Sequence, residues 1–438
     1  MSKRDLSNGN AAVNGTKRKI STDIDEDDDR DHDDHHFSNN KKSKQTREPR
    51  RYTDRSRYKD SAEAEEHGIV LRKYYPPEMT DQRAREYTAG EVERPIETLK
   101  KAIADTKAER ETIQEGTGRG SDSGAVVHWF KCDLRTIDNH GLYQASQTAT
   151  KKGVPLIALY LVSPQDFEAH LTSPVRVDFI LRTLEVLRSD LAALDIPLYV
   201  EVVDKRKVLP ERVIQLCKEW GVNDVYCNIE YEVDELRREA TLARTCLENG
   251  INFTVVPDTC VVEPGDLVSK GSGNQFSVYT PWYRAWCAHV NSHPKLLHEF
   301  PSPTKNPAGA RTKFNDLFES PIPSAPTRKS LTPEEKARFR NMWPAGEHEA
   351  AYRLDKFISQ RIKRYSEARN LPADNGTSVI SVHLASGTLA ARTCVRRARD
   401  ANSSKSMNAG DSNIQSWISE VAWRDFYKHV LAHWPFVW

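Results

Sequence analysis

This sequence of 438 residues contains no apolar run that approaches the length of a membrane-spanning helix, which is about 20 residues. No apolar signal-peptide core opens the chain. Its seven cysteines are odd in number and include no C-x-x-C pair. We therefore expect unpaired structural thiols in an intracellular reducing compartment, and no membrane partner.

Net charge is also nearly absent, because 64 Lys and Arg offset 63 Asp and Glu. The balance hides an asymmetry, since the acidic block DIDEDDDRDHDDHH is followed by the basic stretch KKSKQTREPRRYTDRSRYK, with almost no aliphatic residues. Such a segment cannot bury enough apolar surface to offset its ordering entropy. Residues 1–123 are therefore predicted to be a disordered charged extension.

Two basic clusters within this extension, at residues 17–19 and 41–44, have the form of nuclear import signals. Nonspecific nucleic-acid contacts or a solvated tail would give the same pattern. We expect the nucleus as the location, with the mitochondrion as a second one.

From Ala125 onward, short apolar runs alternate with helical patterns. Five runs have the Val, Ile, Tyr and Phe content of strands buried on both faces: AVVHWF, VPLIALYLV, IPLYVEVV, DVYCNIEY and INFTVV. Helical patterns between them end at Gly221 and Gly250, as helices with a C′ glycine do. This alternation predicts an α/β domain over residues 124–264, built on a doubly wound, Rossmann-like parallel sheet of five strands.

The first loop of that sheet lacks a G-x-G-x-x-G fingerprint, so dinucleotide binding of the Rossmann type is not expected. Ligands of open α/β sheets nevertheless bind at the carboxyl ends of the strands. Charged residues follow the first and fourth strands and are candidates for a ligand site there: Asp133, Arg135, Asp138, Glu230, Asp234 and Glu235. Loop caps or surface charges would give the same pattern.

Residues 265–343 are rich in Pro, Gly, Ser and Lys and are predicted to form an interdomain linker. The aromatic stretch FSVYTPWYRAWCAHV interrupts this linker and must dock on another part of the molecule. Helical patterns without strands dominate residues 344–438, which are predicted to form an all-α domain.

Two basic or polar patterns in the all-α part suit a phosphate-bearing ligand. Thr377 and Ser378 stand before an apolar helical run, where free backbone N–H groups could hold a phosphate or where ordinary N-capping would suffice. Arg392, Arg396 and Arg399 share one helical face, which indicates phosphate contacts or a solvated face.

The closing helical pattern has two different faces. An apolar ridge is formed by Ile418, Ala422, Phe426 and Val430. The other face spans an arc of about 100 degrees and carries Glu420, Trp423, Arg424 and Tyr427. Charged groups between flat rings suit a cavity where a planar heterocycle stacks and polar groups fix its edges. An interhelical salt bridge with aromatic packing is the alternative.

Five stretches, in order along residues 124–438, resemble the photolyase and cryptochrome family. They are HWFKCDLRTIDNHGL, YCNIEYEVDELRRE, FSVYTPWYRAW, RYSEARNLPADNGTSVIS and WISEVAWRDFYKH. Within the family, the sequence is most similar to class I cyclobutane pyrimidine dimer DNA photolyases of the fungal type.

The resemblance implies a flavin and a DNA site in the helical part. The residues that match FAD contacts are Tyr365, Thr377, Ser378, Val379, Ile380, Ser381, Trp417, Glu420 and Arg424. The residues that match DNA contacts are Arg369, Glu420, Trp423, Arg424 and Tyr427. Glu420 matches the carboxyl group that hydrogen-bonds a flipped-out pyrimidine dimer, and Trp423 matches the ring that packs against it. Both are therefore expected to be catalytic.

A light-harvesting antenna is the second chromophore that the resemblance implies. Asp234 and Glu235 stand where members that bind 5,10-methenyltetrahydrofolate have Asn and Glu. The acid at position 234 departs from that pattern, so the identity of the antenna stays open. No metal ligand is expected.

The function implied is light-dependent repair of cyclobutane pyrimidine dimers, in which excited reduced FAD transfers an electron to the flipped-out dimer. Such an enzyme is a deoxyribodipyrimidine photolyase, a carbon–carbon lyase, and a monomer whose partner is UV-damaged DNA. A cryptochrome-type blue-light photoreceptor is one alternative, against which Glu420 and Trp423 argue. A noncatalytic DNA-binding remnant is another.

The helical domain of the family continues beyond the position of Trp438. The resemblance therefore predicts a C-terminally truncated, incomplete all-α FAD-binding domain. On that expectation the chain as written binds FAD poorly and repairs little or nothing.

Overall fold

A computed structural model of the chain describes residues 80–117, 124–271, 273–371 and 373–437. All of them belong to one compact unit, Arg72–Trp438. The prediction of disorder for residues 1–79, including both basic clusters, lies outside the described residues. None of the described helices is long and apolar enough to span a membrane.

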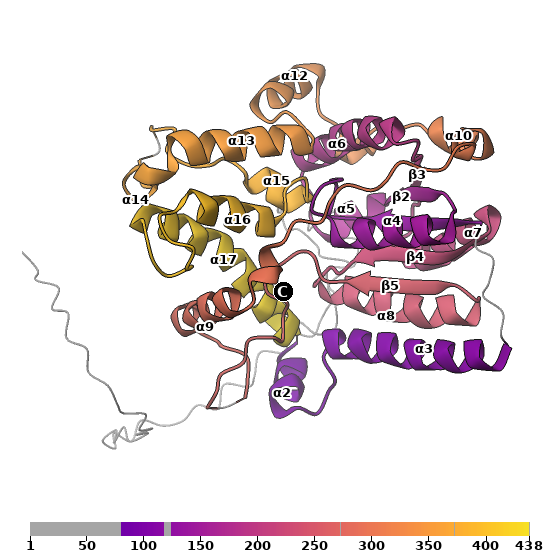
Figure 1. Cartoon of the computed structure of the whole chain (residues 1–438), viewed down its shortest axis with the longest axis horizontal. Helices are drawn as coiled ribbons and strands as arrows, with labels where there is room; N and C mark the ends of the chain where they lie inside the picture. The colour runs from indigo at the N-terminus through magenta and orange to yellow at the C-terminus, as the bar shows by residue number, and fades with distance from the viewer. Residues whose placement is uncertain (1–79, 118–123, 272, 372, 438) are drawn as a thin grey trace, which may run out of the picture. The chain divides into compact units, whose positions relative to one another are not determined.

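A parallel sheet of five strands forms the centre of the α/β part (Figure 1). Its strands are β1 (Ala125–Phe130), β2 (Leu156–Val162), β3 (Leu198–Val202), β4 (Val222–Asn228) and β5 (Asn252–Val256). The strand order is β3-β2-β1-β4-β5, so the chain reverses its direction of winding between β1 and β4. Every residue of β1 and β2 is buried. The predicted doubly wound sheet is confirmed.

Helices cover both faces of the sheet, as the alternation along β1 requires. The helices and one short 3-10 turn of this part are α4 (His140–Lys152), α5 (Pro164–Ala169), α6 (Pro174–Ala193), η2 (Arg206–Val208), α7 (Leu209–Trp220) and α8 (Val233–Glu248). Val126 and Phe130 pack into one apolar core with α4 and α6. Val127 and Trp129 pack into the other core with α7 and α8.

Two helices lie where the sequence predicted only a disordered extension. They are α2 (Asp81–Ala89) and α3 (Pro95–Thr117), and α3 runs along α8 (Figure 1). Leu99 and Ala102 of α3 are fully buried in the core that also holds β1. The prediction of disorder was therefore wrong for residues 80–117. The prediction rested on the composition of the whole extension, charged blocks included. It therefore missed the three-residue spacing of Ile96, Leu99 and Ala102, which is typical of a helix face.

The chain after β5 folds into helices around a separate core. The longer ones are α9 (Tyr279–Ser292), α12 (Pro333–Met342), α13 (Glu347–Gln360), α16 (Ala391–Ala401) and α17 (Ser412–His433). Shorter elements are η3 (Pro294–Leu297), α10 (Ala310–Lys313), α11 (Asn315–Phe318), η4 (Thr327–Lys329), η5 (Ile362–Arg364), α14 (Tyr365–Ala368), α15 (Ser381–Ser386) and η6 (Pro435–Val437). Trp282 and Trp286 of α9 are fully buried against α17 in this core. The aromatic stretch inside the predicted linker thus docks on the helical part.

Candidate functional site

The polar face of α17 is engaged by α14. The guanidinium of Arg369 donates a hydrogen bond to Oε1 of Glu420 and forms an ion pair with it. Both side chains remain about one-third exposed, at 35% and 37%. Arg369 also lies 5.5 Å above the ring of Tyr365, within cation–π range. The salt bridge that the sequence left as an alternative is therefore present, but its arginine is the C-cap residue of α14.

Trp423, one turn further along α17, is held by stacked rings. Its ring lies 3.5 Å from that of Tyr279 at an interplanar angle of 10°. The Tyr279 hydroxyl bonds the backbone oxygen of Ser419 at 2.7 Å and its side-chain oxygen at 2.8 Å, which fixes the stack to α17. Tyr427 lies 5.6 Å from Trp423 and is 63% exposed. The end of this aromatic group is therefore open to a ligand.

The loop before α15 carries the strongest backbone strain near the site. Val379 has a φ of +54°, a left-handed conformation that costs a β-branched residue about 1–2 kcal/mol. Such strain often marks a binding site. The loop sits tightly on α14, because a Cβ added at Gly376 would lie 2.4 Å from Cβ of Ala368.

The hydroxyl groups of this loop do not cap the helix that follows. Ile380, which is buried, occupies the N-cap position of α15 and makes no side-chain capping bond. Among the residues that the structure describes, none is hydrogen-bonded to the side-chain oxygens of Thr377, Ser378 or Ser381. These hydroxyls are available to a polar ligand.

Of the remaining residues matched to a flavin site, two pack on one common ring and Arg424 lies apart from them. Trp417 and Tyr365 are buried, and each ring contacts Phe357, at 5.3 and 5.9 Å between centroids. Arg424 points toward the α/β part, where it donates to the backbone oxygen of Thr259. The structure thus joins Glu420 with Arg369 and places Arg424 in the wall of a different pocket.

That pocket is a cavity of about 440 Å³ at the carboxyl ends of β1, β2 and β4. It adjoins the point between β1 and β4 where the winding reverses, which is where ligands of open α/β sheets bind. Its aromatic lining comes from Trp129, Phe130, Tyr160, Phe167 and Tyr231. Its charged lining comes from Lys131, Asp166, Arg176, Glu230, Glu232, Glu235, Arg238, Arg424 and Lys428.

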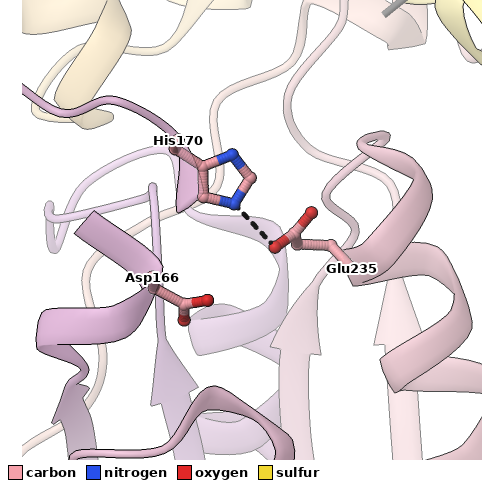
Figure 2. Close-up of side chains that lie close together, drawn as sticks. All are labelled: Asp166, His170 and Glu235. Atoms are coloured by element: carbon pink, nitrogen blue, oxygen red, sulfur yellow. Dashed lines mark hydrogen bonds and ion pairs between the residues drawn. The ribbon is translucent and has the colours of Figure 1, made fainter. Parts of the chain in front are cut away.

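One wall of the cavity holds Asp166, His170 and Glu235 close together (Figure 2). His170 Nε2 lies 2.9 Å from Glu235 Oε1. Burial opposes the charged form of His170, but the hydrogen bond and charge of Glu235 outweigh it and raise the pKa of the imidazole. The three side chains could ligate a metal ion. Arg206, however, already pairs with Asp166 at 2.7 Å and with Glu235 at 3.1 Å, which neutralises the acids.

Several buried polar atoms of the residues that line the cavity, and of Glu239 behind them, have no hydrogen-bond partner among the described residues. They are Tyr231 Oη, Glu235 Oε2, Arg238 Nε and Glu239 Oε2. Burial raises the pKa of Glu239 to about 7, although Lys131 and Arg238 oppose this rise. Buried polar groups are normally satisfied. The cavity therefore has the properties of a site for a planar, polar ligand.

Asp234 and Glu235, the predicted antenna contacts, take different positions at this wall. Glu235 lines the cavity. Asp234 is 29% exposed and bonds Arg206 at 2.9 Å, beside the cavity and outside its lining. His170 and Arg206 were not predicted from the sequence, although His170 stands directly after α5 and just before the Ser173–Pro174 helix start.

The charged loop after β1 has a structural role. Asp133 bonds His128, Asn139 and Asn228 inside the domain. Arg135 pairs with Asp258 and bonds the backbone oxygens of Asp138 and Gly387. Neither residue takes part in the cavity lining.

The basic stripe on α16 meets this loop, and both interpretations offered for it were wrong for its first two arginines. Arg392 is buried and pairs with Asp138 at 2.8 Å and Asp258 at 2.9 Å. Arg396 pairs with Asp138 at 3.1 Å and with Glu299. The ion pairs with Asp138 and Asp258 connect the helical part to the α/β part. The sequence could not show this, because their partners lie more than ninety residues away.

Comparisons with known proteins found similar sequences over most of the chain. Residues 126–304 match the family model described as DNA photolyase. The deoxyribodipyrimidine photo-lyase of Neurospora crassa is 54% identical over 384 residues, which cover 87% of this chain and 61% of that protein. The mitochondrial deoxyribodipyrimidine photo-lyase of Saccharomyces cerevisiae is 29% identical, with 87% and 68% covered. The chain thus spans 61% of the length of its Neurospora relative.

Two solved structures share the fold. A class III photolyase from Agrobacterium tumefaciens superimposes with a TM-score of 0.57 at 22% identity, over 73% of this chain and 61% of that one. A cryptochrome from Synechocystis gives 0.53 at 23% identity, over 70% and 61%. The sheet and helical core therefore have the fold of photolyases and cryptochromes. Residues 126–304 thus match the DNA photolyase family, as the motifs predicted, and the chain is similar over 87% of its length to a fungal deoxyribodipyrimidine photo-lyase.

Proposed function

We propose that this chain forms the α/β part, and the dimer-contacting portion of the helical part, of a light-dependent enzyme that repairs cyclobutane pyrimidine dimers in DNA. The observation that carries the proposal is the α17 face, where Glu420 and the stacked, partly open Trp423 lie side by side with Arg369. The Neurospora relative, 54% identical, is named for this activity.

At this face the chain would receive a pyrimidine dimer that has left the duplex. Unpairing costs least where the lesion has already weakened the base pair. Trp423 would give the extruded bases a stacking surface, and Glu420 would hydrogen-bond their polar edge. Arg369 would bind a backbone phosphate, which makes DNA binding depend on salt.

FAD fits the loop that precedes α15. The hydroxyls of Thr377, Ser378 and Ser381 are available for its polar groups, and the strained backbone at Val379 suits close contact with a ligand. Contacts between Gly376 and α14, and between α14 and α17, join this loop to the dimer face. When bound, reduced FAD supplies the electron that opens the cyclobutane ring after light absorption.

The cavity at the sheet would hold a light-harvesting antenna. Its aromatic walls and unsatisfied buried polar atoms suit a planar, polar chromophore. The candidate is 5,10-methenyltetrahydrofolate, held by Glu235, with Asp234 acting through Arg206. We further propose that the protein acts as a monomer in the nucleus, and in the mitochondrion as its yeast relative is named to do.

One experiment distinguishes a repair enzyme from a photoreceptor that only signals. The protein is reconstituted with reduced FAD, mixed with UV-irradiated plasmid, and kept in the dark or under blue light. Surviving dimers are counted with a dimer-specific endonuclease. A parallel sample joins these 438 residues, in one chain, to the part of the Neurospora relative that the alignment does not cover. We expect light-dependent loss of dimers in the joined protein. Flavin binding without dimer loss would favour a photoreceptor.

A further inference from the structure

The Arg369–Glu420 pair joins two groups that the proposed function assigns to different parts of DNA. Arg369 is the C-cap of α14, and Glu420 lies in the middle of α17. Each side chain is about two-thirds covered, so the pair is accessible to solvent and to a ligand. Tyr365 beneath the guanidinium keeps Arg369 in place without consuming its remaining donors.

While the pair is closed, both groups are restrained. A guanidinium bound to a carboxylate presents little net charge to a phosphate. A carboxylate released near the DNA backbone, in contrast, meets only negative charge unless a base edge satisfies it. Intact duplex DNA offers Arg369 a phosphate but offers Glu420 no base edge. A duplex with an extruded dimer offers both.

We propose that Arg369 is a specificity-determining residue that exchanges Glu420 for a backbone phosphate. This inference rests on the proposed function and deepens it. On intact DNA the exchange leaves Glu420 unpaired, so the closed pair opposes binding. On damaged DNA the base edge takes over the hydrogen bonds that Arg369 gave up, and the opposition disappears. Discrimination then comes partly from a penalty on intact DNA, in addition to contacts with the lesion.

The inference makes a counterintuitive prediction for intact DNA. Glu420→Gln should release Arg369 and raise the affinity for an undamaged duplex about two- to fivefold, the range expected from a partly exposed ion pair. The slope of log affinity against log salt should steepen by about one phosphate contact. In an Arg369→Gln background the same change should have no such effect, because the released group is missing.

The test is fluorescence anisotropy in the dark with a labelled undamaged duplex, for the wild type, both single variants and the double variant. Asp355→Asn is the matched control, since it removes one carboxylate from another exposed arginine pair, Asp355–Arg397. It should raise affinity less than Glu420→Gln does. Urea unfolding confirms that each variant is folded.

Two results would overturn the inference: no gain in affinity from Glu420→Gln, or an equal gain with and without Arg369. Its failure is distinct from failure of the proposed function. A protein that repairs dimers yet shows no gain loses only this inference. A protein that shows the gain but removes no dimers in light keeps the exchange and loses the repair activity.

Discussion

Arg392 of α16 binds two aspartates of the α/β part at once, with Nε 2.8 Å from Asp138 and Nη2 2.9 Å from Asp258. All three side chains are buried. Removing one partner of such a group leaves buried charges uncompensated, which costs more than the pair itself contributes. The junction between the sheet and the helical part should therefore depend on Arg392.

Arg392→Ala should lower the free energy of unfolding by about 3–5 kcal/mol. Urea denaturation followed by circular dichroism measures the change. Arg397→Ala, on the same helix, is the control, because Arg397 is half exposed and, among the described residues, forms an ion pair only with the exposed Asp355. It should change stability by about 0.5 kcal/mol or less. Equal costs for the two variants would show that the buried pairs do not hold the junction.

Asp425 predicts an unusual pH dependence. Its Oδ2 accepts hydrogen bonds from Val261 N, Val262 N and the Trp286 indole, yet burial raises its pKa to about 6. An unfolded Asp has a pKa of about 3.9. The native state therefore binds more protons than the unfolded state between these values, and its contribution to stability falls as the pH rises through them.

Asp425→Asn keeps an oxygen acceptor and removes the charge. It should stabilise the protein by up to about 3 kcal/mol near pH 8 and by little near pH 4. Unfolding midpoints measured across this range test the prediction. Asp425→Ala, which removes the acceptor, should destabilise at both ends. If the Asp425→Asn variant is less stable than the wild type near pH 8, this account of Asp425 is contradicted.

The effect of replacing His170 should be seen at low pH, whereas the effect of replacing Asp425 is expected at high pH. The pKa of its imidazole is raised by Glu235, so the pair contributes fully below about pH 6.5 and is lost as the pH rises through the raised pKa. His170→Gln should therefore cost stability near pH 5.5 and almost none near pH 9. The difference in unfolding midpoint between wild type and variant, followed against pH, should shrink steadily. A constant difference would indicate a packing role instead.

Val379 should tolerate glycine, unlike most valines. Its φ of +54° strains a β-branched side chain, and glycine adopts this conformation freely. The strain relieved offsets the entropy that glycine adds to the unfolded chain, so Val379→Gly should be neutral or stabilise by about 1 kcal/mol. Val278→Gly, at an exposed position with φ −115°, should destabilise by roughly 0.5–1 kcal/mol. Thermal melting of the two variants compares them, and similar losses would refute the strain.

The five strands could be predicted from the sequence because each is a short, largely apolar run, such as Leu156–Val162. Gly221 likewise marked the end of α7, where it adopts the left-handed conformation. The helix α3 was missed because its few apolar positions are diluted by charge. The strands were predicted correctly and α3 was missed for the same reason: both predictions used only the pattern of apolar residues along a short segment.

The candidate site was only partly predictable. The periodicity of α17 correctly put Glu420 and Trp423 on one face, but it could not identify Arg369 or Tyr279 as their partners. Those contacts join residues 51 and about 140 positions apart. They depend on how α9, α14 and α17 pack, which no local pattern encodes.

The central claim is that the α17 face receives an extruded pyrimidine dimer. Dark equilibrium binding of a duplex with one thymine dimer and of the same duplex without it tests this most directly, with Trp423→Leu as the variant. The account predicts that the wild type binds the damaged duplex more tightly than the undamaged one. In the variant, the ratio of the two affinities should fall roughly tenfold, because a stacking surface worth about 1–3 kcal/mol is lost. Equal binding of both duplexes, or an unchanged preference in the variant, would contradict it.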